Sequence, residues 1–164
     1  MNTEAFVALG SNLADPPRQL ERAREALGRL PGTRLVAASR SLRTAPVGPP
    51  GQPHYCNAVV RLRTRLAPFA LLGALLEIET AQGRVRGAQP WGPRTLDLDL
   101  LLYGNLVLDD PRLTLPHPRL HARRFVLEPL AELAPELEVP GRGRVCDLLR
   151  RLDRQGRGRP VCRL

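Results

Sequence analysis

Lysine is absent from this chain: all 25 basic residues are arginine, against 16 acidic residues, and the formal net charge is +9. Without lysine there can be no phosphate-binding loop of the G-x-x-x-x-G-K-[ST] type, so a nucleotide must be held by arginine, a metal ion and backbone groups. A positive charge of this size attracts nucleic acids, membrane surfaces or phosphorylated metabolites. Because the chain also has 17 prolines, we attribute the arginine content to overall composition and discount nucleic-acid binding.

Cysteine and long apolar runs are scarce as well. Cys56, Cys146 and Cys162 are odd in number, widely spaced and outside any C-x-x-C, which argues against a disulfide framework and against a zinc site. No apolar run approaches the roughly 20 residues that cross a bilayer, and residues 1–9 lack the regions of a signal peptide. We therefore expect one soluble, cytoplasmic domain over residues 1–164, with a poorly ordered tail from residue 154.

Apolar periodicity and turn residues predict the order of the elements. We expect strands at 5–9, 33–43, 55–63 and from 96 onward, and helices at 16–30, 67–82, 125–135 and 144–152. Asp15 before Pro16 is typical of a helix N-cap, and Gly10-Ser11-Asn12 of a turn after the first strand. The order strand, helix, strand, strand, helix, strand predicts an α+β, ferredoxin-like βαββαβ core. Its helices would cover one face of the sheet, and the active site would lie on the other face under mobile loops.

The alternation of residues 96–100 predicts a strand with two carboxylates on one face. Leu96, Leu98 and Leu100 alternate with Asp97 and Asp99, so the leucines enter a core and both aspartates share the opposite face. Residues i and i+2 of a strand lie about 6–7 Å apart. Carboxylates this close repel each other unless a cation lies between them, and Mg²⁺ binds one or two carboxylates together with water and phosphates. An exposed polar face would show the same D-x-D pattern.

The segment just before this strand favours the metal interpretation. Arg84, Arg86 and Arg94 lie in a stretch interrupted by glycine and proline, which is too irregular for a helix or a strand. Guanidinium groups match phosphate oxygens in shape and charge, and such a loop suits a mobile cover. Trp91 in the same stretch is also compatible with a core residue. Loop and strand together predict phosphoryl-transfer chemistry.

A second candidate site lies around the strand at 55–63. Tyr55 and Asn57 share one of its faces, and the proline- and glycine-rich residues 44–53 precede it as a loop. A tyrosine and an asparagine placed in this way are able to hold a planar polar ligand by stacking and paired amide hydrogen bonds. A plain hydrogen bond at the strand end is the alternative.

Seven segments of the chain match one known family, in the same order. They are V-A-L-G-S-N-L from Val7, R-T-A-P-V-G from Arg43, Q-P-H-Y-C-N-A from Gln52, Q-G-R-V-R from Gln82, W-G-P-R-T-L-D-L-D-L-L from Trp91, L-P-H-P from Leu115 and R-R-F-V-L-E-P-L from Arg123. Through them the chain resembles the 6-hydroxymethyl-7,8-dihydropterin pyrophosphokinases of folate biosynthesis over nearly its whole length. The W-G-P-R-x-L-D-x-D segment is the most specific of the seven.

This resemblance implies transfer of pyrophosphate from ATP to the hydroxymethyl group of the dihydropterin, with release of AMP. It implies two magnesium ions on Asp97 and Asp99, and Arg84 and Arg94 as catalytic residues. The residues implied for pterin binding are Thr44, Ala45, Val47, Tyr55, Asn57, Trp91 and Phe125. Those implied for ATP binding are Glu79, Arg86, Leu100, Arg112, Thr114, His117 and Arg123. We expect ATP and the reduced pterin as the only partners of a monomer, without nucleic acid or membrane.

Departures from the family pattern concern the adenosine side of the site, at His54, Leu76 and Pro118. Two other classes of protein are compatible with parts of the sequence. A magnesium-dependent nucleotidyltransferase also uses paired aspartates, would release pyrophosphate, and is not separated from a pyrophosphokinase by the D-x-D spacing alone. A basic RNA-binding module of ferredoxin-like fold needs exposed aromatic residues on its sheet. The chain has only three Phe, two Tyr and one Trp, and none lies in an RNP-like run.

Overall fold

The computed structural model describes residues 2–13, 15–44, 54–83, 96–155 and 162–163. Within these ranges the chain forms strands, four α-helices and one 3₁₀ helix. In chain order the elements are β1 (Thr3–Ser11), α1 (Pro16–Gly28), β2 (Thr33–Ala38), β3 (Leu42–Thr44), β4 (Tyr55–Thr64), α2 (Pro68–Ala81), β5 (Asp97–Tyr103), β6 (Leu108–Asp110), β7 (Leu113–Leu115), η1 (Leu120–Ala122), α3 (Arg124–Leu133), β8 (Glu138–Val139), β9 (Gly143–Arg144), α4 (Val145–Arg154) and β10 (Cys162–Arg163).

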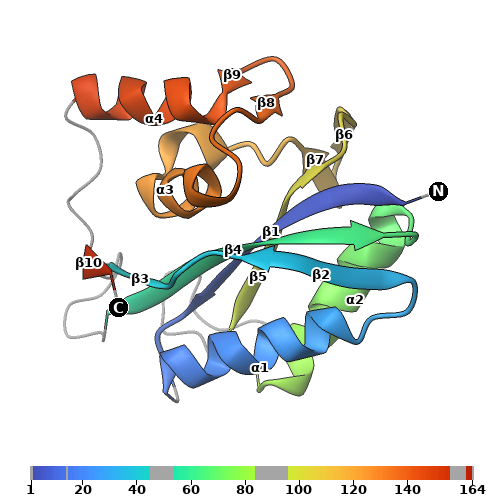
Figure 1. Ribbon diagram of the computed structural model, residues 1–164. Helices are drawn as coiled ribbons and strands as arrows, with labels where there is room; N and C mark the ends of the chain where they lie inside the picture. The colour runs from blue at the N-terminus through green and yellow to red at the C-terminus, as the bar shows by residue number, and fades with distance from the viewer. Residues whose placement is uncertain (1, 14, 45–53, 84–95, 156–161, 164) are drawn as a thin grey trace.

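One antiparallel sheet of six strands organises the molecule (Figure 1). Its strand order is β10-β3-β4-β1-β5, and β2 pairs with β4 beside β3. The two remaining pairs, β6 with β7 and β8 with β9, are small separate hairpins. The long strands β1 and β4 are therefore central, and β5, which carries Asp97 and Asp99, is the last strand on its side of the described sheet.

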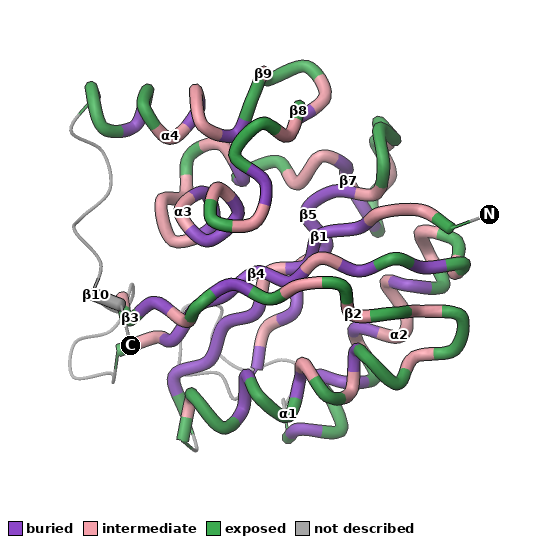
Figure 2. Tube along the Cα trace, viewed as in Figure 1, coloured by how far each residue is buried: buried purple, intermediate pink, exposed green. Residues whose placement is uncertain are grey.

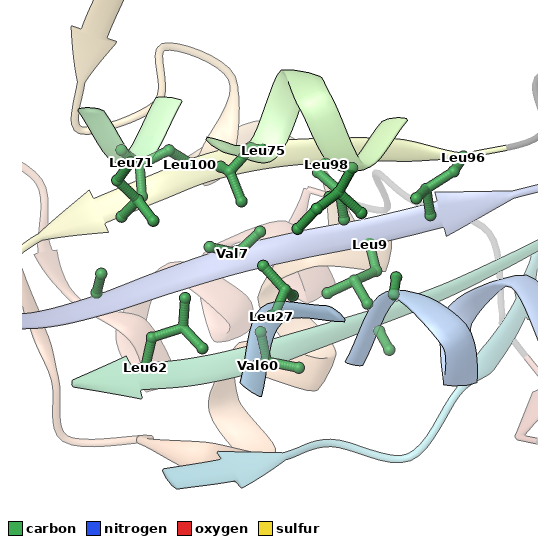
Figure 3. Close-up of a cluster of buried hydrophobic side chains, with 14 of the residues drawn as sticks. Val7, Leu9, Leu27, Val60, Leu62, Leu71, Leu75, Leu96, Leu98 and Leu100 are labelled. Carbon is green, nitrogen blue, oxygen red and sulfur yellow. The ribbon is translucent and has the colours of Figure 1, made fainter. Parts of the chain in front are cut away.

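The face of the sheet that packs on α1 and α2 holds the larger core. Alternate residues of the central strands point to this side, among them Val7, Val60 and Leu98, and they meet Leu27 of α1 and Leu75 of α2 (Figure 3). Both helices present residues at spacings of three and four to the sheet, as an apolar stripe requires. The predicted inward orientation of Leu96, Leu98 and Leu100 is confirmed.

The opposite face carries a second core, which corrects the expectation of helices on one face only. Phe6, Val59, Leu101 and Leu102 point to this side, and α3 and α4 cover them there (Figure 1). The expectation failed because the apolar side chains of this face, such as Leu101 and Leu102, lie further along the strands than Asp97 and Asp99. A second patch of apolar side chains on the other face must also be removed from water, at about 25 cal/mol per Å² of apolar surface.

A change of register in the β1–β5 pair allows β5 to serve both cores. Phe6 is paired with Leu102, whereas the next residue of β1, Val7, is paired with Leu100, so Leu101 is an extra residue in β5. Such a bulge interrupts the alternation of side chains. Leu101 and Leu102 consequently both join the core under α3, while Leu100 stays on the α2 side.

Several predicted boundaries shift in the structure. The turn expected at Gly10-Ser11-Asn12 is wrong at its start, because β1 continues through Ser11 with full pairing to β4. The single strand expected at 33–43 is two strands, since the Ser39 Oγ accepts the Val59 backbone N–H (2.9 Å) and takes the place of a ladder bond. Asp15 does occupy the N-cap of α1, but with a φ of 61° and without a side-chain capping bond. The four helices otherwise end within about two residues of their predicted ends.

Short elements lie between β6 and α3 and in the C-terminal segment. Within 113–125 the structure forms β7 and η1 before α3 begins. Of the segment after α4, Cys162–Arg163 forms β10 and pairs with β3. Among the helices of the described ranges, none combines the length and the apolar character needed to cross a membrane.

Candidate functional site

The candidate site begins with two rows of residues that run across β4, β1 and β5. In the first row Asn57 pairs with Gly10, and Gly10 pairs with Asp97. In the second row Val59 pairs with Ala8, which pairs with Asp99. Neighbouring strands are about 4.8 Å apart, so the Cα atoms of Asn57 and Asp97 lie about 10 Å from each other. Only a glycine lies between them in this row. Both aspartates are partly exposed, and they share the face opposite Leu98 and Leu100, as predicted.

The predicted pterin residues of β3 and β4 also belong to this face. Thr44 of β3 is paired with Tyr55 of β4, and Leu42 with Asn57, so Thr44, Tyr55 and Asn57 follow the same alternation. The Asn57 side-chain Nδ2 donates to the Thr44 Oγ1 (2.8 Å), and Asn57 is only 7% exposed. A strand-end hydrogen bond is therefore present, and it fixes the amide beside the aspartates. Ala45, Val47 and Trp91 lie outside the described residues.

The segment between β7 and α3 brings basic side chains to the aspartates. The His117 backbone N–H donates to the Leu101 carbonyl (2.9 Å), which ties the segment to β5 beside Asp99. The Arg123 guanidinium lies over the ring of Phe125, 5.6 Å from its centroid. Burial lowers the pKa of Arg123, and the negative charges of Asp99 and Asp97 act against this effect. Arg123 and Phe125 are thus grouped with the aspartates through the start of α3.

The surroundings of His117 favour the neutral form of its imidazole. Burial lowers its pKa, and the nearby Arg123 and Arg119 lower it further, whereas Asp99 opposes them. The Arg119 backbone N–H donates to the His117 Nδ1 (3.2 Å), so in the neutral ring the proton lies on Nε2. His117 therefore has an N–H donor available for an oxygen ligand. Arg119, whose charge acts on both His117 and Arg123, was not singled out from the sequence.

The other described residues that are predicted to bind ATP have the following places and contacts within the protein. Glu79 is 3% exposed, and its Oε2 accepts the Leu98 backbone N–H (2.7 Å), so it joins α2 to β5. Leu100 is 3% exposed in the core under α2, and only its backbone is able to contact a ligand. Arg112 stacks on Phe69, 4.2 Å from the ring centroid, and binds Asp110. Thr114 pairs with Asp109 in the β6–β7 hairpin.

Gly10 and Ala8 are the residues of this face that sequence reasoning missed. They are the small residues of β1 on this face, and they lie directly between the Asn57 side and the Asp97 and Asp99 side. The available signal was the G-S-N motif, which we interpreted as a turn because glycine is common there. In a strand interior, glycine instead marks a bulge or a close approach.

The two aspartates fit a magnesium site of the kind that substrate completes. Among the described residues no group of three or more His, Cys, Asp and Glu side chains is gathered as a metal site would require. Mg²⁺ does not need such a cage, because it commonly takes one or two carboxylates and fills its shell with water and phosphate oxygens. The arginines of the predicted loop, Arg84, Arg86 and Arg94, lie outside the described residues, in the connection between α2 and β5.

Comparison with known proteins agrees with the sequence motifs. The family model of 7,8-dihydro-6-hydroxymethylpterin-pyrophosphokinase (HPPK) matches residues 6–135. The 2-amino-4-hydroxy-6-hydroxymethyldihydropteridine pyrophosphokinase of Pseudomonas aeruginosa is 53% identical over 149 residues, which cover 91% of each chain. The enzyme of the same name from Haemophilus influenzae is 47% identical over 89% of this chain and 91% of its own.

Solved structures with the same fold are more distant in sequence. A crystal structure titled HPPK-DHPS in complex with substrates superposes with a TM-score of 0.74 at 12% identity, over 95% of this chain. A Plasmodium falciparum HPPK-DHPS triple mutant with STZ-DHP superposes with a TM-score of 0.75 at 13% identity, over 94% of this chain. This chain spans only 44% and 45% of those longer chains, which therefore support the fold alone. From the family match and the close relatives, the chain belongs to the 7,8-dihydro-6-hydroxymethylpterin-pyrophosphokinase family.

Proposed function

We propose that the chain transfers pyrophosphate from ATP to the hydroxymethyl group of 6-hydroxymethyl-7,8-dihydropterin, releasing AMP, as a step of folate biosynthesis. The observation that carries the proposal is the single sheet face on which Asn57, Asp97 and Asp99 lie together, with His117 and Arg123 beside the aspartates. A planar ligand is then bound at one end of the row Asn57-Gly10-Asp97, and phosphates are bound at the other.

The pterin is held by side chains that are already fixed in place. The Asn57 amide donates to Thr44, which leaves its Oδ1 to accept an N–H of the pterin ring. Phe125 offers an aromatic face, and Tyr55, Thr44, Ala45, Val47 and Trp91 complete the proposed pocket. Holding the ring at Asn57 directs the hydroxymethyl group along the row toward Asp97, which supplies the orientation that the displacement requires.

The phosphates are held by charge. Asp97 and Asp99 would hold the magnesium, two ions in the proposed site, and the metal would supply positive charge against the triphosphate. Arg123 and the Nε2–H of His117 donate to phosphate oxygens, and Arg84 and Arg94 act as catalytic arginines. Arg86, Arg112 and Thr114 are assigned to nucleotide binding. Leu100 is assigned to it through its backbone groups, and Glu79 through its hydrogen bond to the backbone of β5. The hydroxymethyl oxygen forms a bond to the β-phosphorus and gives up its proton to solvent. The bond from that phosphorus to the oxygen of the α-phosphate breaks, and AMP leaves.

The architecture and assembly are also proposed in finer terms. The order β5-β1-β4, with β2 and β3 beyond β4 and every pair antiparallel, supports a ferredoxin-like core formed by β1, α1, β2–β3, β4, α2 and β5. A monomer in the cytoplasm remains our prediction. Light scattering on the purified protein checks the monomer, and a mass of twice the 18.1 kDa chain would contradict it.

The product nucleotide tests the reaction. We expect AMP when the protein is mixed with Mg²⁺, ATP and the reduced hydroxymethyl pterin, and no AMP when the pterin or the metal is left out. Formation of ADP would identify an ordinary kinase, and release of pyrophosphate would identify a nucleotidyltransferase. Either result would overturn the proposal. Omitting Mg²⁺ and adding EDTA is the control for the metal.

A further inference from the structure

Gly10 lies at the centre of the proposed site, yet its backbone does not require glycine. It is paired with Asn57 on one side and with Asp97 on the other, within the regular part of β1. The glycines with positive φ in the described chain are Gly32, Gly83, Gly104, Gly141 and Gly143, and Gly10 is not among them. An L-residue is therefore able to adopt this backbone conformation, and the reason for glycine must be space.

The space above Gly10 is filled by the side-chain oxygen of Asn57. A Cβ added at Gly10 would lie 3.0 Å from the Asn57 Oδ1, while the next atom, the carbonyl oxygen of Cys56, is 3.9 Å away and causes no conflict. The amide has little freedom to move aside, because its Nδ2 donates to the Thr44 Oγ1 (2.8 Å) and the residue is 7% exposed. An alanine at position 10 would thus push the amide oxygen out of its present place by a few tenths of an ångström, against the hydrogen bond that holds the amide to Thr44.

The orientation of the Asn57 amide matters because its nitrogen donates hydrogen bonds and its oxygen accepts them. The nitrogen is used by Thr44, and from the described residues the Oδ1 accepts no hydrogen bond. A nearly buried acceptor that lies over Gly10, in the row between Asn57 and Asp97, suits an N–H donor of a flat heterocycle. If the amide turned, it would present a donor or a displaced acceptor to the same ligand group.

We infer that Gly10 is a positioning residue for the pterin: by lacking a side chain, it keeps the Asn57 amide in the orientation that accepts a ring N–H. The inference rests on the proposed function in one respect, namely that Asn57 binds the pterin. It adds that the G-S-N motif serves substrate recognition through a neighbouring strand, and that position 10 acts on pterin affinity and not on ATP affinity.

A double-mutant cycle tests this inference. Binding of the reduced hydroxymethyl pterin is measured by calorimetry with Mg²⁺ and a non-hydrolysable ATP analogue present, for Gly10→Ala, Asn57→Ala and the double variant. We expect each single variant to bind the pterin about tenfold more weakly, since a buried hydrogen bond is lost in both. The double variant should bind no more weakly than Asn57→Ala, because the amide that alanine displaces is then absent. Affinity for the ATP analogue should stay within about twofold throughout.

The possible outcomes separate this inference from the proposed function. If Asn57→Ala binds the pterin normally, the assignment of Asn57 is wrong. If Asn57→Ala weakens binding but Gly10→Ala does not, Gly10 is not a positioning residue. If Gly10→Ala lowers pterin affinity equally in the unaltered protein and in the Asn57→Ala variant, the new Cβ contacts the ligand directly. That result also overturns the inference.

Matched variants guard against a general loss of structure. Gly73→Ala, in α2, changes glycine to alanine where no heavy atom lies within 4 Å of the added Cβ, and it should leave pterin binding unchanged. If Gly10→Ala fails to fold, the double variant decides, because removing the Asn57 amide removes the 3.0 Å contact. The inference is supported if the double variant has the melting temperature of Asn57→Ala. It is contradicted if the double variant also fails to fold.

Discussion

Asp97 and Asp99 are functional candidates whose side chains do not contribute to a core. Both are partly exposed on the open face of β5, and the leucines between and beside them make the contacts with α2. Asp97→Ala or Asp99→Ala should therefore lower turnover by at least about 10²-fold, because charge stabilisation at the phosphates is lost. The fold should be retained, as measured by circular dichroism alongside the AMP assay.

The control for this prediction is a carboxylate of the same chain that is far from the sheet face. Glu25→Ala, on the exposed side of α1, should leave both turnover and the spectrum unchanged. Unfolding of either aspartate variant would count against a metal role, and normal turnover of both would exclude it.

At the scale of elements, β5 is held in place by α2. The Glu79 carboxylate accepts the backbone N–H of Leu98, the residue between the two aspartates, and so fixes the strand from the opposite side of the sheet. Glu79→Ala leaves that N–H without its acceptor, and we expect a loss of about 1–3 kcal/mol in the free energy of unfolding, together with reduced turnover. Glu79→Gln keeps an oxygen acceptor and should retain most of both. Urea unfolding and the AMP assay check the pair.

Glu77 offers a comparison within the same helix. It is exposed, two residues before Glu79, and Glu77→Ala should change neither stability nor turnover. If Glu79→Gln were as damaging as Glu79→Ala, the carboxylate charge and not the bond to Leu98 would be the important property.

The bulge in β5 explains how one short strand supplies both a site and a core. Before Leu101, side chains on the open face are aspartates, and after it they are leucines that α3 and α4 bury. The site therefore lies at the end of the sheet face that these helices leave uncovered. Figure 2 shows the buried residues of β1, β4 and β5 running between the two helical layers.

For the whole molecule, the histidines predict how stability depends on pH. Burial lowers the pKa of His117 and of His121, and Arg142, which donates to the His121 Nε2 (3.2 Å), lowers that of His121 further. In the unfolded chain both pKa values return to about 6.5. As the pH falls below this value, the unfolded chain binds protons before the folded chain does, so the free energy of unfolding decreases toward acid pH. Above about pH 7 both histidines are neutral in both states, and their full contribution to stability is present.

Urea unfolding of the ligand-free protein at pH 5, 6 and 7 measures this dependence. The variant His117→Gln/His121→Gln should lose less stability between pH 7 and pH 5 than the unaltered chain does, because two of the groups that bind protons on unfolding are absent. An equal or steeper loss in the variant would contradict the prediction.

The sequence by itself determined the family, the order of the main elements and the face on which the aspartates lie. These follow from local patterns: period-two alternation in β5, apolar spacing in α1 and α2, and contiguous motifs such as W-G-P-R-T-L-D-L-D. The residues Thr44, Asn57, Phe125, His117 and Arg123 were named from motifs, and what each contacts depends on segments far away in the chain.

Only the tertiary structure decided how the two faces of the sheet are shared. The register shift at Leu101, the covering of Phe6 by α3 and the contact between Gly10 and Asn57 arise where strands from different parts of the chain meet. No local pattern encodes which strand lies beside which, because pairing depends on the total surface that the assembled sheet and helices bury. For that reason the sequence did not indicate that Glu79 binds the backbone of β5, or that Gly10, interpreted as part of a turn, lies between Asn57 and Asp97.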